Sequence, residues 1–311
     1  MASIPAPNPI SPPIPVTWWK RPKVRRRGLA AALLLCAYGG GLSYGSWTRV
    51  CAGEHCPSIS RLLGPGSGQT QTSKVYAADG RLITELGAER RTVLPLTAIP
   101  LALRQAFLAT EDKRFYSHHG IDYWRIFGAI KNDLLSLSWA QGFSTITMQL
   151  ARNIFPEEIS REKKLTRKLK EARVAVEIER AFPKDTILQL YLNQIDLGAG
   201  AHGVEAAAQI YFGKSARQLN VAEAATLAAL PKAPGNYNPR NHPDRAVARR
   251  NVVLTLMSNQ GYLTPEDAEY WKAYPLVLTS RRTSYGDVAP YFVEWLRSSF
   301  LEPRLDRKSV V

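Results

Sequence analysis

From Pro100 to about Ala273, apolar residues recur every three or four positions, which is the spacing of one face of an α-helix. Proline suits a first helical turn, so we expect a helix to begin at Pro100. Before it, between Lys74 and Thr92, short apolar runs flank Asp79-Gly80, a dipeptide typical of hairpin turns. The pattern predicts a small β-hairpin followed by a mainly α domain.

Polar residues at the ends of the apolar stripes predict where some helices begin and end. Asn220 followed by Glu223 is typical of a reciprocally capped helix start, and Thr264-Pro265 predicts another start. Gly213 and Gly261 stand where helices are expected to stop.

The N-terminal segment has a different pattern. The first 19 residues carry no side-chain charge and are rich in proline, so they cannot build a packed core. A basic cluster follows, and we expect a disordered tail over 1–27. The next twenty residues, Gly28 to Trp47, carry no formal charge. Such a run suits a helix across a hydrocarbon layer about 30 Å thick. The sequence therefore predicts one transmembrane helix over 28–48.

The basic cluster precedes the apolar run, so the positive-inside rule places the N-terminus in the cytoplasm and Arg49 onward outside. A cleaved signal peptide is the main alternative, although the run is long for one; the basic flank argues against a soluble core helix. A linker is expected over 49–73. Within it, Cys51 and Cys56 can close a small loop in an oxidising compartment, and their pairing stays open.

The 41 Lys and Arg residues outnumber the 26 Asp and Glu residues, which gives a formal charge of +15. Such an excess favours a polyanionic partner: nucleic acid, anionic lipid or a phosphorylated substrate. Much of the excess lies in the N-terminal basic cluster and in one helix-like segment near residue 168. We therefore expect no nucleic-acid partner.

The segment Glu111 to Asp122 joins two helix-like segments and is dense in charge. It holds three carboxylates, two cations, two histidines and a glycine. Taken alone, it can be a solvated helix end, and only the later segments favour a chemical role.

Two further segments suit phosphate chemistry. Ser144 and Thr145 open a predicted helix, where free N–H groups and hydroxyls can hold a phosphate or carbonyl oxygen; they can equally be an ordinary cap. Further along, Lys168 and Glu171 share one helix side, and Arg167 precedes the glutamate by four residues. This is either a cationic wall whose carboxylate holds the cations or a metal, or a surface helix with weak ion pairs.

Taken in order, these segments resemble the peptidoglycan glycosyltransferases of family 51, found as monofunctional enzymes and in class A penicillin-binding proteins. The resemblance covers about Lys74 to Tyr291. It is carried by five ordered motifs, of which Ile187 to Asn193 and Leu230 to Pro239 are two, and the other three supply the predicted site residues. These are Glu111, Asp112, Phe115, His118 and Gly120; Ser144, Thr145, Gln149, Arg152 and Asn153; and Arg167, Lys168 and Glu171.

The resemblance implies a mainly α, lysozyme-like domain over 74–275 in a bacterial plasma membrane. It implies lipid II and the nascent glycan strand as partners, with the bilayer and other cell-wall synthesis proteins. Glu111 would be the general base and Glu171 the second carboxylate, which positions a pyrophosphate directly or through a divalent cation such as Mg²⁺ or Mn²⁺. No organic cofactor is implied.

The remaining motif residues have binding or shaping roles by the same resemblance. Asp112, Phe115, His118 and Gly120 would shape the loop that aims Glu111. Substrate or pyrophosphate binding would involve Ser144, Thr145, Gln149, Arg152, Asn153, Lys163, Arg167 and Lys168.

Two positions depart from the family pattern. Phe143 stands where a glycine is usual, and Met148 replaces a glutamine, which we expect to remove a hydrogen bond to sugar or phosphate. Activity is still expected, because both carboxylates are present. Nearby, Leu135 and Trp139 do not fit the helical stripe and can dip into the bilayer.

Residues 276–311 resemble the start of a linker toward a transpeptidase domain that is missing here. Ser160 and Lys163 match a transpeptidase motif by accident, without its partner motifs, so no β-lactam binding is expected. Two other functions remain open: a glycan hydrolase of related fold, and an inactive membrane scaffold that binds lipid II or glycan.

Overall fold

The computed structural model describes residues 73–79, 82–86, 93–127, 144–159 and 164–280, with Gly45, Tyr291, Phe292, Trp295 and Ser299. Gly45 belongs to a compact unit Met1–Glu54 and the others to a second, His55–Val311. Several predictions lie outside the described residues: the tail, most of the transmembrane helix and the linker, the Cys51–Cys56 pairing, and Leu135, Trp139, Phe143 and Lys163. No helix within the described ranges is both long and apolar enough to cross a membrane.

The predicted hairpin is present. Strand β1, Ser73–Tyr76, pairs antiparallel with β2, Leu82–Leu86, and a register irregularity falls between Val75 and Tyr76. These two strands form the one sheet of the described chain.

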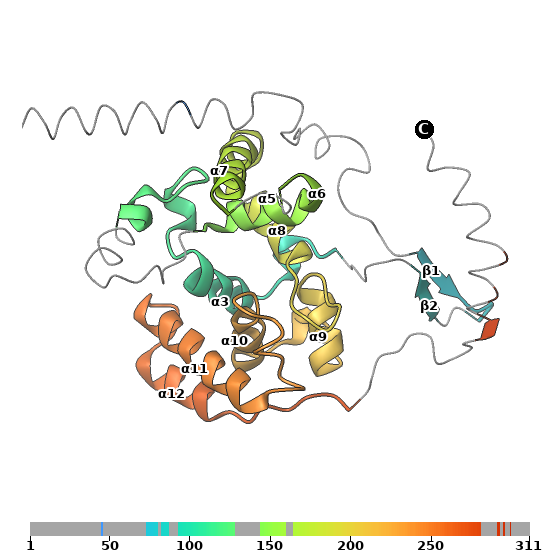
Figure 1. The fold of residues 1–311 in the computed structure, drawn as a ribbon. Coiled ribbons are helices and arrows are strands. Elements are labelled where there is room, and N and C mark those ends of the chain that lie inside the picture. The colour runs from blue at the N-terminus through green and yellow to red at the C-terminus, as the bar shows by residue number, and fades with distance from the viewer. Residues whose placement is uncertain are drawn as a thin grey trace, which may run out of the picture. The chain divides into compact units, whose positions relative to one another are not determined.

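The rest of the described chain is mainly helical, as expected (Figure 1). The α-helices are α3 (Leu101–Glu111), α5 (Ile146–Ile154), α6 (Pro156–Ile159), α7 (Lys164–Ala181), α8 (Lys184–Gln194), α9 (Val204–Phe212), α10 (Val221–Ala229), α11 (Pro243–Asn259) and α12 (Pro265–Ala273). Short 3-10 turns are η2 (Leu96–Ala98), η3 (Phe115–Ser117) and η4 (Ala216–Gln218).

The predicted helix ends are confirmed at atomic detail. Asn220 and Glu223 form a reciprocal capping box at the start of α10. Thr264 accepts the backbone N–H of Asp267 at the start of α12. Gly213 ends α9 in the left-handed conformation, which a residue without Cβ adopts at little cost.

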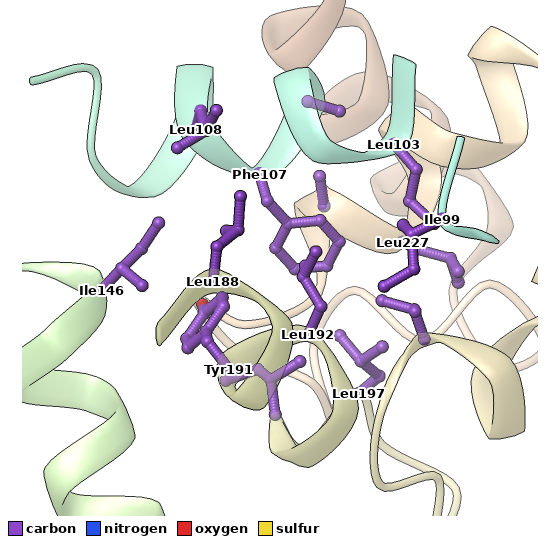
Figure 2. Packing of buried hydrophobic residues seen from close by; sticks show 14 of the residues in the cluster. Ile99, Leu103, Phe107, Leu108, Ile146, Leu188, Tyr191, Leu192, Leu197 and Leu227 are labelled. Atoms are coloured by element: carbon purple, nitrogen blue, oxygen red, sulfur yellow. The ribbon is translucent and has the colours of Figure 1, made fainter. Parts of the chain in front are cut away.

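The core that positions the site lies between α3, α8 and α10 (Figure 2). Leu103 and Phe107 of α3 are fully buried, and the Phe107 ring meets that of Tyr191 edge to face with centroids 6.1 Å apart. Burying each such side chain stabilises the fold by about 1.5–3 kcal/mol. This core fixes α3, and therefore the place of its last residue, Glu111.

Helix α5 is surrounded by protein and packs against α7 and α8. Ile146 and Leu150 are buried as their spacing predicts, but Thr147, Met148 and Gln149 are buried as well. A short helix enclosed in this way directs polar side chains into internal contacts. Its position beside α7 sets the geometry of the site.

Candidate active site

Glu111 is the last residue of α3 and is half-buried. Its Oε2 accepts a hydrogen bond of 2.7 Å from Nε2 of Gln149 on α5. The Gln149 Oε1 in turn accepts 3.2 Å from the hydroxyl of Tyr191 on α8. Three helices therefore hold this carboxylate through one chain of hydrogen bonds.

Burial raises the pKa of Glu111 above its ordinary value of 4.5, because removal from water penalises the charged form. The Gln149 hydrogen bond and the charges of Arg125 and Arg249 lower the same pKa and partly offset this effect. Burial also raises the pKa of Tyr191 well above 10, so its hydroxyl stays protonated and can donate to Gln149.

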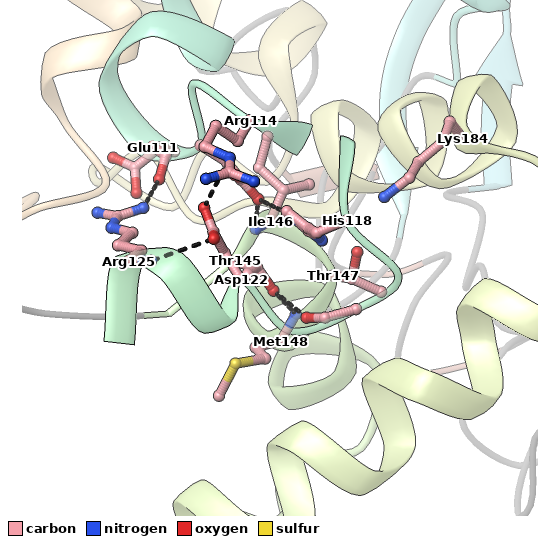
Figure 3. Close-up of polar contacts among 12 residues, drawn as sticks. Glu111, Arg114, His118, Asp122, Arg125, Thr145, Ile146, Thr147, Met148 and Lys184 are labelled. Carbon is pink, nitrogen blue, oxygen red and sulfur yellow. Dashed lines mark hydrogen bonds and ion pairs between the residues drawn. The ribbon is translucent and has the colours of Figure 1, made fainter. Parts of the chain in front are cut away.

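Arg125 was not singled out from the sequence, and Tyr191 was noted only as a position of one resemblance motif, without a role. The Arg125 guanidinium donates to the main-chain carbonyl of Glu111 at 2.6 Å, while its backbone N–H bonds to Asp122 (Figure 3). Tyr191 stands in the apolar run of α8, where its hydroxyl gave no indication of its partner. The Arg125–Glu111 and Tyr191–Gln149 contacts join residues 14 and 42 positions apart, so no helical or strand periodicity contains them.

Asp112 ties the loop after α3 to the start of α5. Its Oδ2 lies 2.9 Å from Nε2 of His118 and accepts the backbone N–H of Ile146 at 3.0 Å. Asp112, His118 and Phe115 are all buried, and Lys184 lies over the Phe115 ring at 4.3 Å. The structure thus brings the expected loop-shaping residues together behind Glu111.

Gly120 packs directly on the backbone of α7. Its φ is +89°, and a Cβ there would stand 3.0 Å from the carbonyl of Ala175 and the nitrogen of Val176. Its own carbonyl accepts 2.7 Å from the hydroxyl of Thr145. The position requires glycine both for conformation and for space.

Gly120→Ala is expected to lower the free energy of unfolding by at least about 1 kcal/mol more than Gly200→Ala. Gly200 also has a positive φ, +72°, but a Cβ added there would have no atom within 4 Å. The pair therefore separates close approach from backbone strain. Urea midpoints of the two variants test this, and equal midpoints would show that Gly120 is not tightly packed on α7.

Thr145 and Met148 turn inward. Thr145 caps α5 by accepting the Met148 N–H at 3.2 Å, and its side chain is fully buried. This placement suits a cap rather than substrate contact. Met148 is 1% exposed and packs inside the protein, and the expected loss of a hydrogen bond to sugar or phosphate at this position stays a prediction. Enclosure of α5 by its neighbours is the physical reason for this burial.

Glu171 lies on α7 with no exposed surface and is surrounded by cations. Its Oε2 accepts 2.6 Å from Nζ of Lys168, which also donates to Ser144 at 2.6 Å. Arg152 and Arg167 approach Oε1 at 3.6 Å. One carboxylate among three cations leaves a local positive surplus, which favours an anionic ligand.

Helix α5 connects the two carboxylates. Gln149 holds Glu111, and Arg152, three residues later on the same helix, approaches Glu171. Side chains at this spacing are neighbours on a helix. Asn153 is the next residue along α5, and its Nδ2 is buried without a partner in the described chain. A half-buried carboxylate and a cationic cluster therefore both contact one helix.

The residues around Glu171 do not fit a divalent cation. A metal site needs several oxygen ligands, whereas Glu171 is a single carboxylate whose oxygens face Lys168, Arg152 and Arg167. Among the described residues, no cluster of three or more Asp, Glu, His or Cys side chains could hold a metal ion.

Glu111 is expected to act as a general base, so the reaction rate should fall at low pH, where its carboxylate is protonated. Gln149→Leu is expected to move this acidic limb of the pH–rate profile to higher pH, because the hydrogen bond that it removes lowers the pKa of Glu111. The rate at neutral pH should fall by about tenfold, the value of one hydrogen bond to a charged group. Gln260→Leu is the control: Gln260 also bonds to α3, at the Ala109 carbonyl, but touches no carboxylate. If the acidic limb of the pH–rate profile stays in place in Gln149→Leu, Glu111 is not the group whose ionisation controls the rate.

Comparison with known proteins identifies similar sequences. The family model described as Transglycosylase matches residues 79–258. Penicillin-binding protein 1A of Aquifex aeolicus is 48% identical over 228 residues, covering 73% of this chain and 31% of the relative. Penicillin-binding protein 1A of Escherichia coli is 47% identical over 224 residues, covering 72% and 26%. The chain thus spans less than a third of the length of these relatives.

A solved structure is also similar, the crystal structure of penicillin-binding protein 1A from Haemophilus influenzae. It is 29% identical in sequence with a TM-score of 0.43, and the match covers 75% of this chain and 25% of that one.

Proposed function

This chain belongs to the transglycosylase family, and from that membership we propose that it is a peptidoglycan glycosyltransferase with a lysozyme-like domain. Its substrate is lipid II, a disaccharide-peptide carried on undecaprenyl pyrophosphate. The product is a glycan strand that remains attached to the lipid carrier. One observation carries the proposal: α5 contacts both carboxylates, Glu111 of α3 through Gln149 and Glu171 of α7 through Arg152.

Glu111 is proposed as the general base. It takes the proton of the acceptor GlcNAc 4-hydroxyl while that oxygen forms a bond to C1 of the donor MurNAc. The bond from C1 to the pyrophosphate oxygen breaks, and undecaprenyl pyrophosphate leaves with the electron pair. Attack opposite the leaving group inverts the anomeric centre. General-base help is typically worth about 10²–10⁴ in rate.

The setting of Glu111 suits this role. Burial raises its pKa above the ordinary value of 4.5, which strengthens the carboxylate as a base. The Gln149 hydrogen bond and the charge of Arg125 act in the opposite direction and favour the ionised form. Gln149 acts through Glu111, so we treat it as a positioning residue.

The cations around Glu171 are proposed to stabilise the leaving pyrophosphate. Negative charge grows on its oxygens as the bond to C1 breaks, and fixed cations stabilise that charge more in the transition state than before it. Glu171 holds Arg152, Arg167 and Lys168 in place by its ion pairs. Lys163, just before α7 in the sequence, is proposed to join them.

A lipid-linked substrate requires a site at a membrane surface. We therefore propose that residues 28–48 anchor the chain in a bacterial plasma membrane, with a cytoplasmic N-terminus and the domain 74–275 outside. The basic cluster before residue 28 supports this orientation. The bilayer and the growing strand are then the immediate partners.

Incubation of the purified full chain with fluorescent lipid II tests the proposal. Polymer that is cleaved by a muramidase supports synthesis of glycan strands. Bound lipid II without any polymer would instead indicate a scaffold, and shortening of preformed glycan would indicate a hydrolase. Either of these two results would overturn the proposed function.

A further inference from the structure

A pocket of about 530 Å³ lies between the loop 114–124 and the C-terminal half of α7. Its lining includes neither Glu111 nor Glu171. Ligand sites typically measure about 300–1,000 Å³, so the pocket has room for a small polar group. It is separate from the cationic cluster described above, although both use α7.

The two acidic residues of this pocket already have partners. Asp122 Oδ2 lies 3.7 Å from the Arg114 guanidinium. Glu179 Oε1 accepts 2.6 Å from the Thr147 hydroxyl and 2.8 Å from Nζ of Lys184. Their charges are therefore compensated by neighbouring groups, and they leave the pocket without excess negative charge.

The side of the pocket that Arg180 and His119 form is more exposed than the acidic side. Arg180 and His119 both line it and are exposed. Within the described chain, neither side chain has a hydrogen bond or ion pair. An arginine presents several donors in a planar fork, which suits a phosphate group. The pocket is therefore electrostatically suited to an anion.

Large aromatic side chains stand at the rim. Tyr123 and Trp124 line the pocket and are 66% and 73% exposed, and Phe127, on the same helical turn, is 74% exposed. Tyr and Trp are the residues enriched at the level of lipid headgroups. A free inorganic anion would be recognised without this apolar rim, whereas a headgroup bound to acyl chains uses both parts.

We propose that this pocket binds the phosphate headgroup of an anionic membrane lipid. Arg180 and His119 contact the phosphate, while Trp124 and Phe127 lie at the boundary of headgroups and acyl chains. The proposal rests on the proposed function only in that a lipid-linked substrate brings the domain to a bilayer. It assigns to the loop after α3 a lipid site that is separate from the reacting groups.

The pocket adjoins the residues that hold Glu111. His118 lines the pocket and bonds to Asp112, which receives the first N–H of α5. On the other side of the loop, Asp122 bonds to the backbone N–H of Arg125, whose guanidinium holds the Glu111 carbonyl. A bound headgroup would therefore set the distance of the loop 114–124, and of Glu111 behind it, from the bilayer surface.

Fluorine NMR of the full chain tests the proposal. The chain is labelled with fluorotryptophan, held in uncharged detergent, and the Trp124 signal is assigned with Trp124→Phe. Short-chain phosphatidylglycerol is expected to shift this signal saturably, and short-chain phosphatidylcholine or inorganic phosphate at equal concentration is not. Arg180→Gln should weaken binding by about tenfold, as expected for one charge-assisted hydrogen bond. Arg217→Gln, an exposed arginine on η4, should leave it unchanged.

Several results would overturn the headgroup assignment. These are no saturable shift, an equal shift with phosphatidylcholine or with inorganic phosphate, a shift with a soluble disaccharide-peptide alone, or unchanged affinity in Arg180→Gln. The binding needs no turnover and is expected to persist in Glu111→Gln. Loss of polymerisation and loss of lipid binding are therefore distinguishable failures.

Discussion

Replacing Glu111 with glutamine is expected to reduce glycan polymerisation by at least about a hundredfold, the lower range for removal of a general base. Glutamine keeps the shape of the side chain but cannot take the proton of the acceptor hydroxyl. Initial rates with labelled lipid II measure the loss. Glu269→Gln is the control, since Glu269 is an exposed glutamate paired with Lys272 on α12. A Glu111→Gln chain with the wild-type rate would contradict the assignment of the base.

The same substitution is expected to stabilise the fold at neutral pH. Because burial raises the folded-state pKa of Glu111 above 4.5, the folded protein binds this proton more tightly than the unfolded chain. The glutamate therefore contributes stability at low pH that is lost as pH rises through the raised pKa. Glutamine does not titrate, so Glu111→Gln should melt higher than wild type at pH 7, and this gain should shrink near pH 4. If Glu111→Gln melted lower than the wild type at pH 7, burial of the ionised Glu111 side chain would not be destabilising, which contradicts the raised pKa.

Lys168→Met is expected to lower the polymerisation rate by about 10²–10³, the range seen when one electrostatic stabiliser of a transition state is removed. Lys168 makes the shortest contact to Glu171, at 2.6 Å, and also bonds to Ser144. Methionine retains the length of the side chain without its charge. We also expect a loss of about 1–3 kcal/mol in stability, because Glu171 is buried and loses its nearest partner.

Lys272→Met provides a close control for that substitution. Lys272 pairs with Glu269 three residues away at 2.7 Å, and its side chain is 23% exposed, compared with 24% for Lys168. The difference is the partner, since Glu269 is exposed and Glu171 is not. Surface pairs contribute about 0–1 kcal/mol, so stability and rate should hardly change. If the two substitutions changed stability and polymerisation rate equally, the cations around Glu171 would have no particular role in the reaction.

Local patterns predicted the elements well. The expected helix from Pro100 appears as Leu101–Glu111, the hairpin forms around Asp79, and the capping box at Asn220 is present. The resemblance to the glycosyltransferase family is confirmed by the family match. These features depend on spacing and on neighbours within a few residues, which a single sequence displays directly.

Contacts between distant segments could not be predicted in the same way. The Tyr191–Gln149–Glu111 chain joins residues separated by 42 and 38 positions. Met148 is buried because α7 and α8 both pack against α5. Hydrophobic periodicity predicts only one buried face for such a helix, so it does not predict that Met148 is buried. The Arg125 side chain donates to the backbone carbonyl of Glu111. Every residue has such a carbonyl, so no side-chain pattern indicates which one an arginine will bind.

The most direct test of the central claim is the stoichiometry of the reaction. The amount of undecaprenyl pyrophosphate released is compared with the amount of disaccharide incorporated into muramidase-sensitive polymer. Group transfer through Glu111 predicts, for the wild-type chain, one carrier released for every disaccharide incorporated except the one that keeps its carrier in each strand. For Glu111→Gln it predicts that both amounts fall by at least about a hundredfold. Polymer formed at the same rate in Glu111→Gln, or lipid carrier released without polymer, would contradict the account.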